Sequence, residues 1–361
     1  MALNGPTKLI LMALVFSIFA PTAGATVTVV DGAGRSLQVP ARIERAYVTS
    51  PVGAVLLYTL APDRLVGWNS KLGAAEKHFL LPSVHDLPTL GGWFGENGKG
   101  NRETLLAARP DVILSIGYND PTAIDFANRL QQQLGIPVFL ASGRMLDTAA
   151  TYELVGDLLG VPERAKSLAV YTRRAFAAAK TLAESVPPAA RPTVYYAEGL
   201  RGLQTDSTES MHTEPLDFLG LENVAALAET SGFGRAPVSL DQVIAWQPQV
   251  ILACPERAQR DGSWAPEWLD DPTWRQVPAV AGNRVYLIPG APFNWLDRPP
   301  SASRVLGVKW LLWVLYPERV DFDMVAETRE YFRLFYRYEM EEAEARAILF
   351  ASRPQLVTPT P

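Results

Sequence analysis

The segment NRETLLAARPDVIL, residues 101–114, decides the fold because its pattern returns as SLDQVIAWQPQVIL, residues 239–252. Each segment has a polar residue suited to capping a helix, apolar residues at helical spacing, a proline and a short apolar strand. A second pair, LLYTLAPDRLVG (56–67) and PLDFLGLENVAA (215–226), keeps the same chain order. Any α/β unit can show one such pattern, so the interpretation depends on both pairs together. They predict one lobe built twice, with a ligand between the copies.

The predicted fold class is α/β, with two similar lobes of mainly parallel sheets flanked by helices, because strand-like and helix-like segments alternate in both halves. We expect an N-terminal lobe at 26–146, a helical segment at 147–188, and a C-terminal lobe at 189–361 with a disordered tail. The helical segment includes an alanine-rich stretch of about 24 residues, or roughly 36 Å of helix, bounded by Pro162 and Pro187. This stretch is predicted to join the lobes stiffly, although a long surface helix within one domain is an alternative.

Residues 1–25 read as a cleavable export signal. Lys8 supplies the positive start, residues 9–20 the apolar core, and Ala23-Gly24-Ala25 a small-residue cleavage pattern. The cleavage region has no cysteine to carry a lipid anchor. We therefore expect a free periplasmic protein.

Composition argues against a nucleic-acid-binding protein and against a protein stabilised by an intramolecular disulfide. The 38 acidic and 33 basic residues nearly balance and form no long basic run, which argues against a nucleic-acid partner. The single cysteine, Cys254, excludes an intramolecular disulfide. The chain is long enough for two cores without such a cross-link.

The order and spacing of these segments resemble the class III substrate-binding proteins of ABC importers, the receptors for ferric siderophores, haem, vitamin B12 and related metal species. The resemblance rests on SPVGAVLLYTLAPDRLVGW, NRETLLAARPDVILSIGY, the long mid-chain helix, SLDQVIAWQPQVILA and NRVYLIPGAPFNWLDRPPSASRVLGVKWLLWVLYP. It implies two lobes joined by one rigid helix, with small opening motions and acidic residues that dock on a permease. Val55 stands where many relatives have a glutamate, so the first-lobe docking contact is in doubt, although Asp63 and Glu222 lie nearby in the repeated segments.

Ligands of open α/β sheets bind beyond the carboxyl ends of the strands. Six aromatic residues fall in loops predicted at those ends and would offer flat apolar area to a planar metal chelate. Each could instead pack its own loop onto its lobe. The six are Trp68, Trp93, Phe94, Tyr118, Phe293 and Trp295.

Polar candidates lie in or beside the same loops. Arg298 could bind a carboxylate or oxoanion through both guanidinium nitrogens, or form a structural pair with Asp297. His212 could supply an axial ligand to a chelated metal, although an ordinary loop histidine is the simpler interpretation. No ligand pair has the spacing of a directly bound metal, and no resident cofactor is expected. The remaining candidates are Ser50, Asn69, Lys71, Tyr196 and Glu198.

The predicted function is capture of an iron or other metal complex, such as a siderophore, haem or corrinoid, for delivery to an inner-membrane permease. The protein is expected to be a monomer. The alternative ligand is a small oxoanion, molybdate or tungstate, held in a polar pocket by Arg298 and backbone N–H groups. A hydrolase is disfavoured because the chain has no G-x-S-x-G or S-x-x-K motif, and a scaffold protein would not need two similar lobes.

Overall fold

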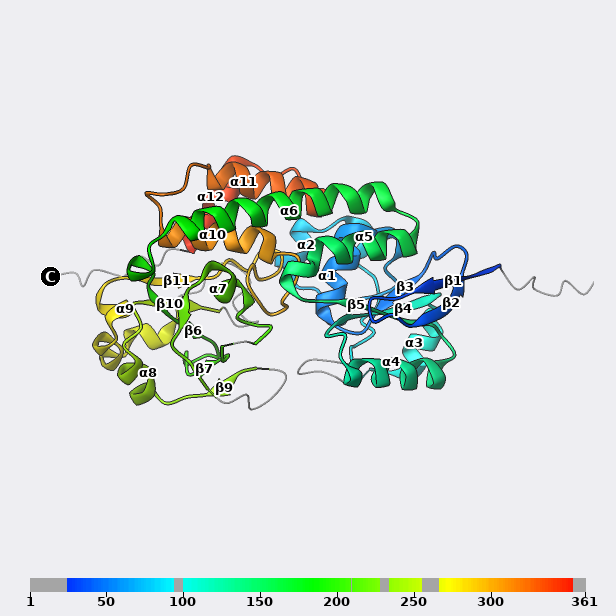
Figure 1. The fold of residues 1–361 in the computed structure, drawn as a ribbon, viewed down its shortest axis with the longest axis horizontal. Helices are drawn as coiled ribbons and strands as arrows, with labels where there is room; N and C mark the ends of the chain where they lie inside the picture. Colours follow the sequence, from blue (N-terminus) through cyan, green and yellow to red (C-terminus); the bar gives the residue numbers. More distant parts are fainter. Residues whose placement is uncertain (1–24, 94–99, 209, 228–233, 255–265, 353–361) are drawn as a thin grey trace, which may run out of the picture.

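The computed structural model describes residues 25–93, 100–208, 210–227, 234–254 and 266–352. It has two lobes side by side, each with its own parallel sheet, and one long helix that crosses both (Figure 1). The predicted export signal and C-terminal tail lie outside the described residues, apart from Ala25. No described helix is long and apolar enough to cross a membrane.

The first lobe follows an N-terminal antiparallel hairpin. Its sheet has the order β3-β4-β5 and is parallel throughout. Residues 65–68 add only single bridges, Leu65 to Ala46 and Trp68 to Thr89. The elements are β1 (Thr26–Val30), β2 (Ser36–Pro40), β3 (Ala46–Val48), α1 (Pro51–Leu60), α2 (Ala74–Phe79), α3 (Arg102–Ala108), β4 (Val112–Gly117), α4 (Pro121–Leu134) and β5 (Val138–Ser142).

The second lobe has a similar parallel sheet with a fourth strand, in the order β11-β10-β6-β8. A small antiparallel pair, β7 with β9, lies beside it. The elements are β6 (Thr193–Ala197), β7 (Gln204–Thr205), α7 (Glu214–Leu219), β8 (Glu222–Asn223), β9 (Ala236–Pro237), α8 (Leu240–Trp246), β10 (Val250–Ala253), α9 (Pro278–Ala281) and β11 (Val285–Leu287).

The repeated segments 101–114 and 239–252 fold alike. Asn101 caps α3 by accepting from the N–H of Thr104, and Ser239 caps α8 by accepting from that of Gln242. Both helices are seven residues long and end in a left-handed residue, Arg109 or Gln247, just before a proline. The strands that follow, β4 and β10, each lie inside their sheet. The predicted duplication is therefore matched in local structure and in sheet position.

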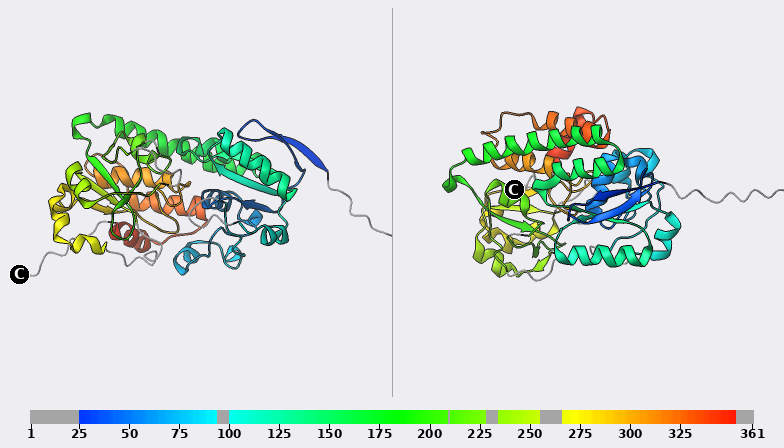
Figure 2. Two further views of the ribbon diagram at one scale, coloured as in Figure 1. Left: turned by 90° about the horizontal axis from the view of Figure 1, so that it is seen from below. Right: turned by 45° about the vertical axis from the view of Figure 1, so that its right-hand side comes forward.

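Helix α6 (Pro162–Ser185) is the predicted interlobe helix and has 24 residues. It starts at Pro162, and the N–H that proline lacks would have no partner in the first turn of a helix. Helix α5 (Thr148–Leu159) packs antiparallel beside it in the views of Figures 1 and 2. The core that α6 covers is continuous, since it includes Val48 and Val112 of the first sheet and Val194 and Leu252 of the second. This shared core joins the two lobes.

The C-terminal helices also join the lobes. They are α10 (Arg304–Leu315), α11 (Met324–Tyr331), a π-helical turn (Phe332–Tyr336) and α12 (Glu342–Ala351). Tyr336 stacks on Tyr58 of α1, with ring centroids 5.8 Å apart, and Phe332 packs edge-on against Phe79. The end of the chain, assigned from sequence to the second lobe, thus also packs on the first. The π-helical turn directly follows α11 and ends at Tyr336.

Candidate functional site

Six charged or polar side chains meet where strand β6 of the second lobe ends: Tyr196, Glu198, Asp206, His212, Asp297 and Arg298. Glu198 directly follows the strand and is fully buried. Arg298 donates to both of its carboxylate oxygens, from Nε at 2.6 Å and from NH2 at 3.1 Å. The same NH2 donates to Oδ2 of Asp206 at 2.8 Å. Arg298 is therefore held by carboxylates of its own protein.

Asp297 is the second centre of this cluster. Its Oδ2 accepts from the hydroxyl of Tyr196 at 3.1 Å, and its Oδ1 lies 2.7 Å from Nδ1 of His212. Burial disfavours the charged carboxylate, but the charges of His212 and of two arginines outweigh burial and hold the pKa of Asp297 below its usual range. Asp297 is thus ionised at neutral pH.

The environment of Asp206 shifts its pKa in the opposite direction from that of Asp297. It follows β7 and is only 1% exposed. Burial, a hydrogen bond with Glu198 and the charge of Glu198 raise the pKa of Asp206 to about 9. Its Oδ1 accepts no hydrogen bond from the described chain. At neutral pH the site therefore holds a proton on Asp206 that an ordinary aspartate would have released.

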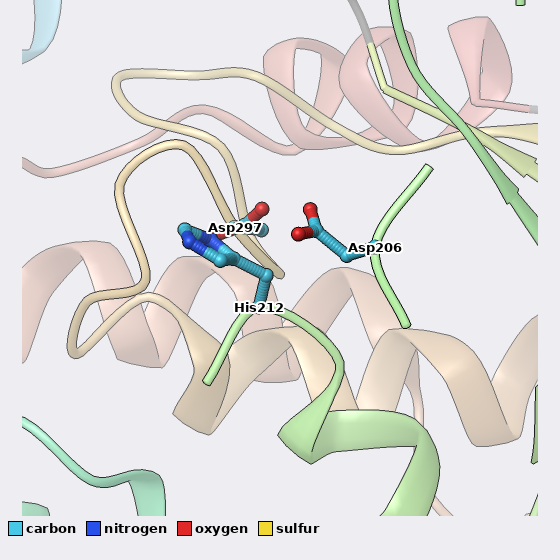
Figure 3. A group of neighbouring side chains, drawn as sticks. All are labelled: Asp206, His212 and Asp297. Atoms are coloured by element: carbon cyan, nitrogen blue, oxygen red, sulfur yellow. The ribbon is translucent and has the colours of Figure 1, made fainter. Parts of the chain in front are cut away.

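Asp206, His212 and Asp297 are close enough to act as a ligand set (Figure 3). Each offers one nitrogen or oxygen atom, and these atoms all lie within 4.8 Å of one another. The sequence prediction of no directly bound metal rested on the lack of closely spaced ligands in the chain. It missed this group because its members lie far apart in sequence and meet only through the fold.

A buried ion-pair network connects the cluster to the first lobe. Arg304 is 1% exposed and donates to Oε2 of Glu214 at 2.9 Å. Burial lowers the pKa of Arg304, which the charges of Asp297 and Glu214 partly offset. The same Oε2 accepts from the backbone N–H of Met145 at 2.8 Å, and Arg144 forms an ion pair with Oε1.

Several predicted first-lobe candidates lie near the ends of β3 and β4. Ser50 immediately precedes α1 and is buried, with Oγ 3.5 Å from the carbonyl of Ile116. Asn69 donates from Nδ2 to the carbonyls of Val48 and Gly91, both at 2.8 Å, while its Oδ1 has no hydrogen-bond partner in the described chain. These contacts fix the positions of Ser50 and Asn69 beside the sheet.

The structure also describes a cavity of about 210 Å³ in the first lobe, which brings together Trp68 and Lys71 of the predicted set. Lys71 is exposed, whereas Trp68 is buried and donates from Nε1 to the carbonyl of Val84 at 2.9 Å. The wall combines apolar and basic residues: Trp68, Lys71, Leu72, Lys77, His85, Leu87 and Thr89.

The predicted aromatic residues separate into two groups. Trp68, Phe293 and Trp295 are buried and serve as packing residues, with the rings of Trp68 and Phe293 6.2 Å apart across the lobe boundary. Trp295 is 1% exposed and donates to the carbonyl of Ala291. The expected display of these three rings to a ligand is not seen, because the loops fold back onto the core. Trp93 is half-buried and Tyr118 is 41% exposed, while Phe94 lies outside the described residues.

Two lobes of similar topology joined by one long helix define a bilobal solute-binding protein. The family model of the periplasmic binding proteins matches residues 92–292, and the chain belongs to this family. It is the solute-binding protein of an ABC transporter, in the class III group that sequence had indicated. The family consists of binding proteins rather than enzymes.

Solved structures and curated relatives cover most of the chain. An ABC transporter solute binding protein from Sulfurospirillum deleyianum is 31% identical, with a TM-score of 0.78 over 89% of this chain and 98% of that one. The molybdate-binding protein MolA of Haemophilus influenzae is 27% identical over 91% of this chain and 96% of its own. The vitamin B12-binding protein of Vibrio campbellii is 27% identical over 56% of this chain and 67% of its own.

Proposed function

We propose that this protein captures an iron or other metal complex, of the siderophore, haem or corrinoid type, and delivers it to an inner-membrane permease without chemistry of its own. It acts as a monomer in the periplasm, exported by the cleavable signal at residues 1–25. The ligand binds between the lobes, beyond the carboxyl ends of the two sheets.

The observation that carries this proposal is the carboxylate-rich edge of the second sheet. Glu198, Asp206 and Asp297 are all buried there. Arg298, the residue best suited to an oxoanion, is held by two of them in hydrogen bonds of 2.6–3.1 Å. A small dianion would have to displace these carboxylates, and like charges at such distances repel strongly where water is excluded. A metal complex with little net negative charge avoids that cost.

The first lobe contributes to the same binding surface. Tyr118 follows the end of β4 and is 41% exposed, and Trp93 is half-buried against Tyr47 with ring centroids 5.7 Å apart. Aromatic rings in such positions give flat contact area to a planar chelate at low entropic cost. Ser50 and Asn69 shape the wall beside the sheet, where their donors bind carbonyls of the chain, and the exposed Lys71 adds a positive charge at the margin.

A second candidate is a molybdate or tungstate receptor. It is favoured by the similarity to MolA, which extends over 91% of this chain. In that case Lys71 and backbone N–H groups would bind the anion. Arg298 would not, because its Nε and one terminal nitrogen already bind Glu198 and Asp206.

Intrinsic fluorescence titration tests the proposal. The protein is titrated with ferric siderophores, haemin, cobalamin, nickel and molybdate. We expect saturable quenching with a one-to-one stoichiometry for one metal complex and none for molybdate at the same concentration. Saturation by molybdate alone would favour the second candidate, and conversion of any added compound to product would contradict the receptor assignment.

A further inference from the structure

We propose that the cavity in the first lobe is a separate binding site for a small organic anion, a monocarboxylate with an apolar body. Its wall comes from one segment, residues 68–89, which runs from the bridge at Trp68 through α2 to the bridge at Thr89. The lining residues all belong to the first lobe, so the cavity is distinct from the cluster around Asp297. This inference goes beyond capture of a metal complex and does not depend on it.

The size of the cavity limits the ligand. Its volume is about 210 Å³. An apolar cavity of about 150 Å³ holds a benzene molecule, so one ring with a carboxylate fits in the larger space here. Pockets for drug-sized ligands have volumes of about 300–1,000 Å³, and a porphyrin or corrin is therefore too large for this cavity.

The charge of the wall favours an anion. The lining includes Lys71, Lys77 and His85 and no carboxylate. Lys71 is exposed and forms no ion pair with the residues that the structure describes. Lys77 lies 3.6 Å from Oδ1 of Asp86, whose side chain is fully exposed, so solvent screens this pair. The positive charge of both lysines is therefore available to a ligand.

The rest of the wall favours an apolar body on that anion. Trp68 is 4% exposed, and its Nε1 already donates to the carbonyl of Val84 at 2.9 Å. Its indole therefore offers ring surface rather than a hydrogen bond, and Leu72 and Leu87 add aliphatic surface. A tetrahedral oxoanion would leave these apolar groups uncovered, whereas an organic acid covers them and also pairs with the lysines.

Hydrogen bonds hold this wall in place before a ligand binds. The backbone N–H of Trp68 donates to the carbonyl of Pro88 at 2.9 Å, and that of Leu90 donates to the carbonyl of Trp68 at 2.8 Å. These bonds join the two ends of the segment. Nε2 of His85 donates to the carbonyl of Leu80 at 2.9 Å, which fixes the imidazole. A wall fixed in this way loses little conformational entropy on binding.

The cavity and the edge of the second sheet therefore select ligands of different charge. Glu198, Asp206 and Asp297 are buried at that edge and disfavour an anion. The wall of the cavity has lysines instead. An organic acid is expected in the first lobe alone.

Benzoate titration tests the site, with the uncharged benzamide as the matched probe. Binding to the purified protein is followed by saturation-transfer NMR of the probe. We expect benzoate to bind one-to-one with a dissociation constant of about 0.1–1 mM, and benzamide to bind at least about tenfold more weakly. Displacement of benzoate by an equal concentration of molybdate would overturn the assignment to an organic anion.

Two variants of the wall locate the probe. Lys77→Gln should weaken benzoate binding about three- to tenfold, and Thr89→Glu, which adds a negative charge at an exposed position, at least about tenfold. Lys166→Gln on the exposed face of α6 is the control and should stay within about twofold. Circular dichroism checks the fold, and either variant is informative if the other misfolds.

Equal affinity for benzoate and benzamide would overturn the proposal, as would unchanged benzoate binding in a folded Thr89→Glu variant. Titration of the same variant with haemin and cobalamin reports separately on the proposed function. We expect it to bind a metal complex as wild type does while it loses benzoate. Failure of wild type to bind any metal complex would remove the proposed function and leave the cavity site standing.

Discussion

Glu214 at the start of α7 in the second lobe accepts a hydrogen bond at 2.8 Å from the backbone N–H of Met145, which lies just beyond β5 in the first. The same oxygen accepts from Arg304 of α10 at 2.9 Å. One buried carboxylate thus links the first lobe, the second lobe and the C-terminal helices. Together with the continuous core under α6, this link joins the two lobes.

Replacing Glu214 with Gln should therefore destabilise the whole chain. The change leaves the buried Arg304 without its carboxylate, and breaking a buried pair costs roughly 3–5 kcal/mol. Urea unfolding of the variant measures this loss. Glu222→Gln, at an exposed position of β8, is the matched control and should change stability by less than about 0.5 kcal/mol. Equal midpoints for the two variants would contradict the role of Glu214.

The pKa of Asp206 predicts a pH-dependent difference between wild type and Asp206→Asn. The folded-state pKa of about 9 lies above the ordinary value of 3.8. The folded form therefore binds the proton more tightly, so this group's contribution to stability is complete below pH 3.8 and is lost as pH rises toward 9. Asn carries no such proton. We expect the stability of the variant relative to wild type to rise by at least about 1 kcal/mol between pH 5 and pH 8.

Thermal melts of both proteins across that interval provide the measurement. Asp271→Asn serves as the control, because Asp271 is exposed and hydrogen bonds from the backbone N–H and the side chain of Thr273 lower its pKa instead. The stability of the Asp271→Asn variant relative to wild type should not increase as pH rises. A constant difference between Asp206→Asn and wild type would show that Asp206 is ionised throughout.

Gly307 on α10 should not tolerate a methyl group. A Cβ at this position would lie 2.1 Å from the carbonyl oxygen of Trp295 and 2.7 Å from Leu296. Forcing the loop away from the helix should cost at least about 1–3 kcal/mol. At Gly117 a Cβ meets nothing within 4 Å, so Gly117→Ala is the control. Chemical denaturation should separate the two variants, and equal stability would argue against this close approach.

The two kinds of tryptophan should respond differently to ligand. Trp93 is half-buried beside the end of the first sheet, whereas Trp295 is fully enclosed. Trp93→Phe should remove a larger share of ligand-induced quenching than Trp295→Phe. Fluorescence titration of both variants with the ligand that binds wild type gives the comparison. A larger loss in Trp295→Phe would mean that the buried loop opens to ligand.

Much of the fold could be predicted from local chemistry. The caps Asn101 and Ser239, the prolines after α3 and α8, and the apolar runs of β4 and β10 all have short-range causes. The ends of α6 follow from Pro162 and Pro187 for the same reason. Ser50-Pro51 separates β3 from α1, because a proline suits the first turn of a helix.

The candidate site was predicted less completely. Glu198, His212 and Arg298 could be predicted as site residues because they lie in loops that follow predicted strands. Their pairing with one another is a property of the tertiary fold. Nothing in the sequence pointed to Asp206, since the strand that precedes it, β7, is only two residues long. His212 and Asp297 are 85 residues apart, and no spacing rule connects them. The direction of a loop side chain is equally non-local, which is why Trp295 in an aromatic loop packs inward.

Competitive isothermal titration calorimetry tests the central claim most directly. The protein is titrated with haemin, cobalamin and ferric siderophores, each with and without excess molybdate. We expect one metal complex to bind one-to-one with a dissociation constant of about 1 μM or tighter, equivalent to roughly −8 kcal/mol, and without competition from molybdate. Saturable binding of molybdate, with no heat from any metal complex, would contradict the account.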